Sequence, residues 1–226
     1  MDNTHTLVMA CATVIEEMMP YLPEGMQHQV FEFGLHVNPD KLRETLQEAI
    51  DAVSGQYETI ILGYGLCSQA IVGIKANGCR LVVPRVDDCI AIFLGSRNAY
   101  NDQTQSEPGT YYLTKGWIEV GDTPFSEYDH LAEKYGKEKA DRIFKIMMGN
   151  YKRLALINTG QYEVEKYREY AGRTAEKFGL RYEEIEGSNT LVKQMLLGPW
   201  DDDVVVLEPG ETFVLQQFFR PGEITP

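Results

Sequence analysis

Short strand-like runs alternate with helical segments in the first hundred residues, and this alternation constrains the fold more than any other feature. The runs are residues 7–11, 28–34, 58–63 and 80–84. Between the second and third runs, apolar side chains recur at helical spacing after Pro39, and Gly55 provides a stop signal. Buried strands that alternate with helices are typical of parallel sheets with right-handed crossovers. The sequence therefore predicts an α/β fold.

The same pattern returns in the second half of the chain. Strands are predicted at 154–160, 181–187 and 204–210, with helices at 162–178 and 190–198. The stretch 97–126 is rich in Asn, Gln, Gly and Pro and is predicted as a loop with a short aromatic strand, TYYLT. A long amphipathic helix is predicted over about 127–150.

This pattern predicts two Rossmann-like lobes with mostly parallel sheets. The expected segments are an N-terminal lobe at 1–96, an aromatic loop and connecting helix at 97–150, and a C-terminal lobe at 151–226. A single continuous sheet is the competing architecture.

Composition and charge exclude several classes of function. The 226-residue chain is 43% hydrophobic, which supports a sizeable core. Its net charge of −13 argues against nucleic acid and against an anionic membrane surface, because both require clustered Lys and Arg. No apolar run approaches the roughly 20 residues of a membrane span, and the N-terminus lacks a signal-peptide pattern. We expect a cytoplasmic protein with reduced cysteines.

Three cysteines occupy equivalent positions in this pattern. Cys11, Cys67 and Cys89 each follow a predicted strand at the start of a helical stretch, and His36 follows the remaining strand. Parallel strands would place all four side chains along the carboxyl edge of one sheet, where open α/β sheets build their sites. Backbone N–H groups at a helix N-terminus would lower the thiol pKa. Cys79 precedes its strand, so we expect it to be structural.

These four side chains are the candidate metal ligands. Three thiolates and one imidazole would form a tetrahedral zinc site. Three thiolates alone could hold an iron–sulfur cluster and leave one iron open for substrate. The alternative is that no metal binds: each cysteine is a small core residue and His36 caps the next helix or is exposed. A thiol enzyme with Cys67 as nucleophile is a weaker option.

Two neighbouring sequences supply candidate ligand-binding and catalytic residues. In GYGLCS, Gly63 and Gly65 match the first two glycines of a dinucleotide fingerprint, but Ser68 replaces the third. We therefore exclude a full NAD site and expect a ligand to approach the backbone closely there. In PRVDDC, we expect Arg85 to hold an anionic group and Asp88 to act beside it, although Asp87 or Asp88 is also expected to cap a helix.

The second half supplies four further candidates for ligand binding. Tyr112 and Trp117 lie in an aromatic stretch that could line a cleft and hold a quaternary ammonium ion, or could form a satellite core. Thr159 and Asn189 follow the predicted strands of the second lobe. They are ordinary cap and turn residues unless the two lobes close over a ligand.

The phrases LGYGLCSQAIVGIKA, PRVDDCIAIFLGSRNAY and PGTYYLTKGWIE resemble an uncharacterised family of methanogenic archaea and anaerobic bacteria, known only as a domain of unknown function. The resemblance covers about residues 7–210 and includes the positions of Cys11, Cys67 and Cys89. Members of this family are often encoded near corrinoid-dependent methyltransferases, which implies a role in anaerobic one-carbon metabolism. The resemblance implies no specific reaction.

Two functional hypotheses follow. The first is a thiolate-ligated metal protein, with zinc or an iron–sulfur cluster, that acts as an enzyme on a small-molecule substrate. The second is a metal-free protein that binds a small molecule, or serves as an accessory to a corrinoid protein or methyltransferase.

Overall fold

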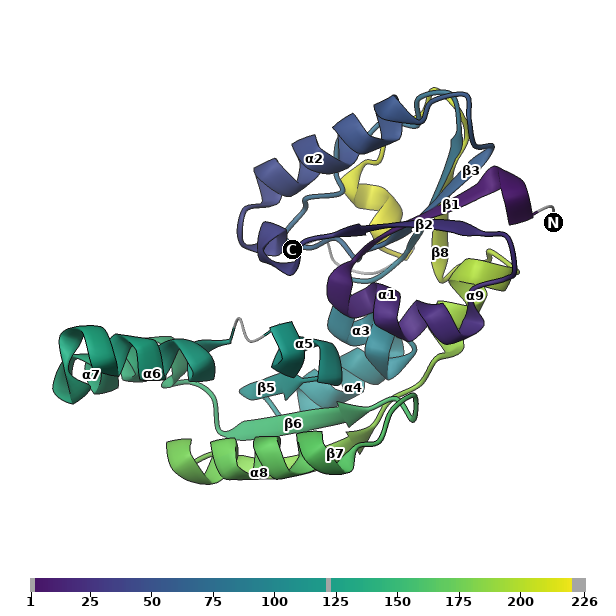
Figure 1. Ribbon diagram of the computed structural model, residues 1–226. Coiled ribbons are helices and arrows are strands. Elements are labelled where there is room, and N and C mark those ends of the chain that lie inside the picture. Colours follow the sequence, from purple (N-terminus) through teal and green to yellow (C-terminus); the bar gives the residue numbers. More distant parts are fainter. Residues whose placement is uncertain (1–2, 121–122, 221–226) are drawn as a thin grey trace. The chain divides into compact units, whose positions relative to one another are not determined.

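The computed structural model describes residues 3–120 and 123–220. Two compact units make up the chain: Met1–Ala99 together with Ser188–Pro226 (unit 1), and Tyr100–Gly187 (unit 2). Each unit contains its own sheet. The prediction of an α/β fold with two mostly parallel sheets is confirmed (Figure 1).

Unit 1 is built on a five-stranded sheet with the order β2-β1-β3-β4-β8. The first four strands are parallel to their neighbours, and β8 pairs antiparallel with β4. The strands, in sheet order, are β2 (Gln27–Phe31), β1 (Thr6–Cys11), β3 (Thr59–Gly63), β4 (Arg80–Pro84) and β8 (Val204–Leu207).

Helices cover both faces of this sheet, which explains why its central strands are apolar along their whole length. Figure 1 shows a long helix on one face and shorter helices packed together on the other. In the long helix, Leu42, Leu46 and Ile50 are buried at a spacing of four residues. The helices are α2 (Pro39–Ala52) on the first face, and α1 (Ala12–Met18), α3 (Cys89–Leu94) and α9 (Thr190–Leu197) on the second.

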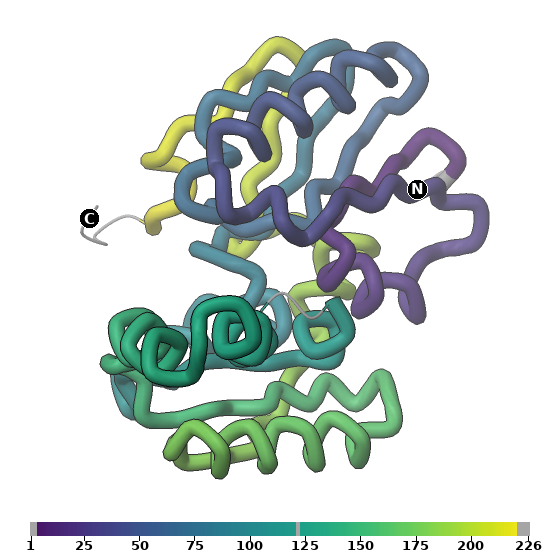
Figure 2. The backbone as a smooth tube through the Cα atoms, turned by 60° about the vertical axis from the view of Figure 1, so that its left-hand side comes forward, coloured from purple at the N-terminus to yellow at the C-terminus, as the bar shows by residue number. Residues whose placement is uncertain are grey.

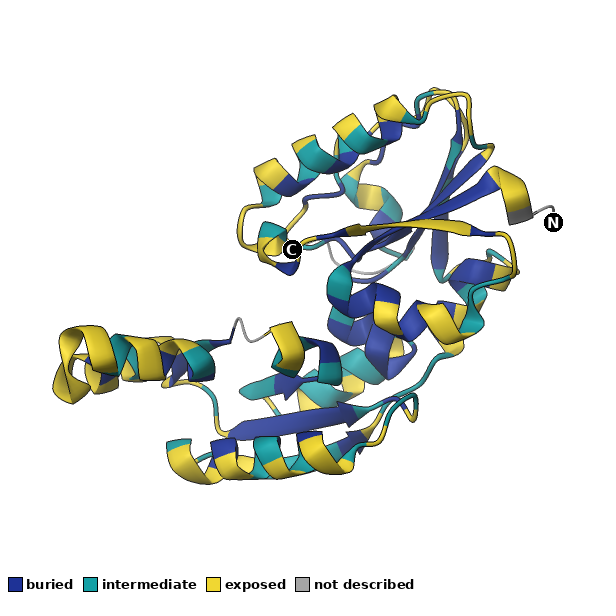
Figure 3. Cartoon of the chain, in the orientation of Figure 1, coloured by how far each residue is buried: buried dark blue, intermediate teal, exposed yellow. Residues whose placement is uncertain are grey.

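Four short 3₁₀ helices complete unit 1: η1 (Asn3–His5), η2 (Met19–Tyr21), η3 (Phe33–Val37) and η4 (Leu215–Phe218). The buried side chains concentrate in the central strands and on the inner sides of the helices, whereas the edge strand β2 is largely exposed (Figure 3).

Unit 2 contains a three-stranded parallel sheet with the order β5-β6-β7. Its core gathers apolar and aromatic side chains, including Leu113, Phe125, Leu154 and Tyr167. The strands are β5 (Thr110–Leu113), β6 (Arg153–Asn158) and β7 (Arg181–Glu186), and the helices are α5 (Lys115–Val120), α6 (Pro124–Tyr135), α7 (Lys137–Met148) and α8 (Glu165–Phe178). Helix α4 (Arg97–Ser106) continues from unit 1 into unit 2.

The predicted domain boundaries need correction. Strand β8 and helix α9, which we assigned to a C-terminal lobe at 151–226, belong to unit 1. Val204–Leu207 pairs with Leu81–Pro84, so the end of the chain returns to the first sheet and completes its core (Figure 2). Their spacing along the sequence matches the preceding βα pattern, which is why they were assigned to the second lobe.

Residues 97–150 are not a loop and a connecting helix. The first part forms α4 and α5 on either side of β5. Helix α4 is polar, and only Arg97 is buried in it, so it shows no apolar periodicity in the sequence. The predicted long helix is an αα-hairpin, because Gly136 has a φ of 84° and ends α6. Within residues 3–120 and 123–220, no helix has the length and apolar character needed to span a membrane.

Candidate functional site

Unit 1 brings the three predicted cysteines to one edge of its sheet. Cys11 is the last residue of β1, Cys67 lies four residues beyond β3, and Cys89 is the first residue of α3 after β4. Because β1, β3 and β4 are adjacent and parallel, all three loops leave the sheet at its carboxyl edge. The thiols interact electrostatically: Cys11 raises the pKa of Cys67, and both raise the pKa of Cys89.

A left-handed turn presents Cys67. Cys67, Ser68 and Gln69 have φ values of 45°, 57° and 68°. This conformation costs a non-glycine residue roughly 1–2 kcal/mol. The segment therefore forms no right-handed helix, contrary to the helix predicted after the glycine turn. Strain of this kind is concentrated at functional sites in proteins.

Backbone hydrogen bonds hold this turn against the loop that follows β4. The N–H groups of Leu66 and Cys67 donate to the carbonyl oxygens of Val86 and Asp87, each at 2.9 Å. Gly65 permits the approach, because a Cβ atom there would lie 2.7 Å from the backbone nitrogen of Asp88. A Cβ atom at Gly63 would lie 2.5 Å from that of Ala10 on β1. Both glycines thus serve close packing of the protein chain, which accounts for them without a ligand.

Tyr64, between these two glycines, was missed by the sequence reasoning. Tyr64 is only 4% exposed, and its hydroxyl group has no hydrogen-bond partner among the described residues. Burial raises the pKa of Tyr64, and the neighbouring thiols of Cys11 and Cys67 add to this effect. The side chain is therefore a neutral, buried and unpartnered phenol beside two of the three cysteines. Its position at the end of a buried strand, within GYGLC, was the available sequence signal.

The thiols of Cys67 and Cys89 are protonated at neutral pH, which corrects the expectation of lowered pKa values for these two residues. Burial, followed by the charge of Asp88, raises the pKa of Cys67 to about 12 against the opposing N–H group of Gly65. Burial, followed by the charge of Asp88, also raises the pKa of Cys89 well above its ordinary value. Desolvation thus outweighs the favourable backbone dipoles at these positions. This finding disfavours Cys67 as a free nucleophile.

The two candidate catalytic residues have structural partners. Asp88 caps α3 by accepting from the N–H group of Ile90 at 2.9 Å, so the predicted cap is confirmed. Arg85 donates through its guanidinium to the carbonyl oxygen of Gln217, in the C-terminal segment. Asp87 accepts a hydrogen bond from Arg97 at 3.3 Å. Arg85 is thus engaged by the protein, whereas Asp88 acts on the cysteines through its charge.

His36 does not join the cysteines. It lies in η3, is exposed, and its Nδ1 atom is 2.5 Å from the carbonyl oxygen of Phe33, against whose ring it packs. Among the residues that the structure describes, no group of three or more His, Cys, Asp or Glu side chains is close enough to hold a metal ion. A preformed Cys₃His zinc site is therefore absent from that part of the chain. Cys79 is buried at the opposite end of β4, where we expected a structural residue.

The remaining candidates are divided between the units. Ser68 is exposed on the left-handed turn, and Asn189 precedes α9 in unit 1. In unit 2, Tyr112 is buried near Tyr100, with ring centroids 6.3 Å apart. Thr159 follows β6 and, with Asn158, lines a pocket of about 480 Å³ at the carboxyl edge of β6 and β7.

Aromatic packing in unit 2 favours the satellite core over a cage for an ammonium ion. The ring of Tyr111 meets those of Trp117, Phe125 and Tyr151 edge-on, at centroid distances of 6.2, 5.0 and 5.4 Å. Trp117 packs against the hydrophobic core of the unit. These contacts favour the core alternative for this aromatic stretch, and ammonium binding by Tyr112 and Trp117 stays a prediction.

Comparisons with known proteins identify a family. No curated protein and no solved structure matches the chain. A family model described as "Protein of unknown function (DUF1638)" matches residues 30–196, which include Cys67 and Cys89, whereas Cys11 lies before the matched region. This match spans well over half of the 226 residues, and the chain therefore belongs to the DUF1638 family of proteins of unknown function.

Proposed function

We propose that Cys11, Cys67 and Cys89 bind a thiolate-ligated metal centre at the carboxyl edge of the sheet in unit 1. The observation that carries this proposal is the gathering of three mutually interacting thiols beside the unpartnered hydroxyl group of Tyr64. Buried polar groups are nearly always hydrogen-bonded, so an unpartnered phenol suggests a missing ligand. Three soft donors indicate a thiophilic metal.

The described residues favour an iron–sulfur cluster over a single zinc ion. Two thiolates on one zinc, each about 2.3 Å from the metal, must lie within about 4 Å of each other. No group of three such ligands exists among the described residues, although the charges of Cys67 and Cys11 raise the pKa of Cys89. A cluster distributes its cysteines over different iron atoms and tolerates wider spacing. Three cysteine ligands also leave one iron open for substrate.

The chain's own residues would prepare such a centre for chemistry. Metal binding would deprotonate the thiols and so overcome the effect of burial on their pKa values. Tyr64, which is neutral, could donate a hydrogen bond to a substrate atom held beside Cys11 and Cys67. An open iron site, when bound, supplies a Lewis acid for a small-molecule substrate. We place this chemistry in anaerobic methyl transfer, in methanogenic archaea and related bacteria, on the family resemblance in the three quoted phrases.

Metal analysis of protein purified without oxygen tests the proposal. We expect about three to four iron atoms per chain, with acid-labile sulfide, in the unmodified protein and in Cys79→Ala. Cys67→Ala should lose both, because it removes one ligand, whereas Cys79 lies at the other end of β4. One zinc without sulfide would correct the metal but keep the site. Absence of metal from the unmodified protein, or full metal content in Cys67→Ala, would contradict the proposal.

A second candidate is metal-free binding of a small molecule, or an accessory role for a corrinoid methyltransferase, at the same edge. The protonated thiols of Cys67 and Cys89, and the absence of a ligand set among the described residues, favour this alternative. It predicts thermal stabilisation of metal-free protein by methylated amines or a corrinoid protein, with loss of that stabilisation in Tyr64→Phe. No shift with any of these additives would count against it.

A further inference from the structure

A pocket of about 690 Å³ lies in unit 2, whereas the three cysteines belong to unit 1. It is lined by residues of α6 and α7 and of the turn between α8 and β7. Its volume is typical of sites for small molecules. The pocket combines aromatic side chains with three lysines, Lys137, Lys145 and Lys177.

The aromatic side chains form a fixed apolar platform. The rings of Phe144 and Phe178 are stacked, with centroids 4.2 Å apart and an interplanar angle of 25°. Tyr128 meets both rings edge-on, at 5.6 and 5.1 Å. The hydroxyl group of Tyr128 donates to Asp141 at 2.5 Å, which holds α6 against α7. An apolar body placed here would contact side chains that are already positioned.

The charge around this platform is opposite to that of the chain. Three lysines and a single carboxylate, Asp141, line the pocket, so the lining has a net charge of 3 − 1 = +2, against −13 for the whole chain. Lys177 pairs with Asp129 at 2.7 Å. Local cations of this kind can attract an anion that the bulk of the molecule repels.

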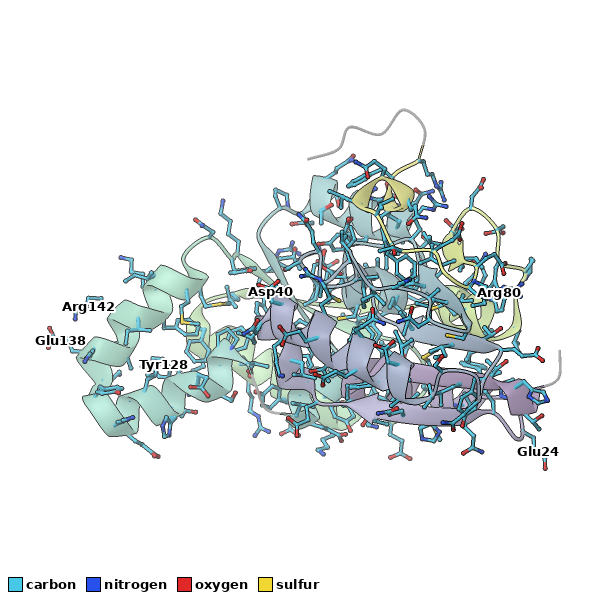
Figure 4. The ribbon with its side chains drawn as sticks, turned by 90° about the horizontal axis from the view of Figure 1, so that it is seen from above. Glu24, Asp40, Arg80, Tyr128, Glu138 and Arg142 are labelled. Atoms are coloured by element: carbon cyan, nitrogen blue, oxygen red, sulfur yellow. The ribbon has the colours of Figure 1, made fainter. Side chains whose placement is uncertain are left out.

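Helix α7 directs its residues to two sides. Lys137, Asp141 and Lys145 recur every four residues and line the pocket. Glu138 and Arg142 do not line this pocket and project away from the helix (Figure 4), and they line a neighbouring cavity of about 490 Å³ together with Lys137. The pocket side of α7 therefore carries two cations whose intervening carboxylate is engaged by Tyr128.

We propose that this pocket binds a small anionic molecule with a flat apolar body, such as an aromatic carboxylate, sulfonate or phosphate ester. The body would lie on Phe144 and Phe178, and the anionic group beside Lys137 and Lys145. The competing explanation is that these lysines only solvate the hairpin. This proposal does not depend on the metal centre, because all the residues that carry it lie in unit 2.

Two fluorescent probes with the same ring system test the proposal on the full chain. 1-Anilinonaphthalene-8-sulfonate carries an anionic group, and N-phenyl-1-naphthylamine lacks it. We expect saturable one-to-one binding of the sulfonate and weaker binding of the neutral probe. Lys137→Gln and Lys145→Gln should each weaken sulfonate binding about three- to fivefold and leave the neutral probe unchanged. The control is Lys139→Gln, since Lys139 lies over the ring of Tyr135 at 4.3 Å and does not line the pocket.

Three results would overturn the proposal: equal affinities for the two probes, an unchanged sulfonate affinity in the double lysine variant, or an equal loss in Lys139→Gln. Far-UV circular dichroism and thermal melts of each variant exclude partial unfolding, which also increases dye binding. Nuclear Overhauser contacts between the bound sulfonate and the Met148 methyl group would place the probe in this pocket. Contacts confined to methyl groups other than those of Met148, Ala132 and Leu180, which all line the pocket, would refute the assignment.

Discussion

Replacing Ser68 by glycine should stabilise unit 1. Ser68 has a φ of 57°, its side chain is exposed, and a left-handed residue other than glycine costs roughly 1–2 kcal/mol. Glycine removes that cost but loses about 0.5–1 kcal/mol of backbone entropy on folding. The expected net gain in unfolding free energy is therefore about 0.5–1 kcal/mol. For a chain of this size, that gain corresponds to a rise in melting temperature of roughly 1–4 °C.

Replacing Gln69 by glycine tests the same effect at the next residue of the turn. Its φ is 68° and its side chain is exposed, while its carbonyl oxygen, which glycine retains, accepts from Arg43 at 3.3 Å. The double variant, Ser68→Gly with Gln69→Gly, should be more stable than either single variant, and its departure from their sum measures the coupling between these adjacent residues. Urea denaturation monitored by circular dichroism gives the free energies, and calorimetry gives the melting temperatures.

Two controls make the sign of the effect decisive. Ser68→Ala keeps the unfavourable φ and should not gain stability. Glu48→Gly, on the exposed face of α2, should lose about 1 kcal/mol, because glycine is unfavourable inside a right-handed helix. If Ser68→Gly destabilises the protein as Glu48→Gly does, the turn is not left-handed in solution and the reasoning from strain fails.

Three further predictions concern buried groups and charge. Tyr64→Phe should raise the unfolding free energy of metal-free protein by about 1 kcal/mol in urea titrations, because it removes a buried hydroxyl group without a partner. Gly65→Ala should lower the melting temperature, because its Cβ atom would meet backbone at 2.7 Å, whereas Gly172→Ala in α8 has open space and should raise it. The pKa of Glu184 is lowered, chiefly by its hydrogen bond from Arg168, so the stability it contributes is present above pH 4.5 and is lost as pH falls through the lowered value. Arg168→Gln should flatten that acid-side dependence in stability measurements from pH 7 to 3.

The sequence predicts those strands and helices that are specified by a local pattern of apolar residues. Buried apolar runs at β1, β3 and β4 are recognisable because both faces of those strands are covered. The shared edge of the cysteines followed from the parallel, right-handed connections between such strands. Neither inference required knowledge of distant contacts, and both describe the backbone.

Features that depend on distant contacts or on backbone geometry were not predictable in the same way. Strand β8 joins the first sheet through its pairing with β4, more than a hundred residues earlier in the chain. The left-handed turn at Cys67, Ser68 and Gln69 contains no glycine, so the sequence gives no sign of its positive φ values. Its conformation is set by hydrogen bonds to the loop after β4. His36 was expected at the cysteine edge because β2 is parallel to β1, but the η3 helix leaves it exposed.

The protonation of Cys67 and Cys89 depends both on the local backbone and on distant contacts. Topology gathers three cysteines, and a helix-start argument alone would make them anionic. Burial and the charge of Asp88 reverse that outcome at Cys67 and Cys89, so the free protein holds these two thiols neutral beside a neutral Tyr64 whose hydroxyl group has no partner among the described residues. The left-handed turn and the buried hydroxyl group together cost on the order of several kcal/mol. A ligand that satisfies Tyr64 and binds the thiolates only in the folded state would offset this cost, and folding stability would then increase with ligand concentration. The dependence of unit 1 stability on metal therefore separates a ligand site from a set of core cysteines, which would gain nothing.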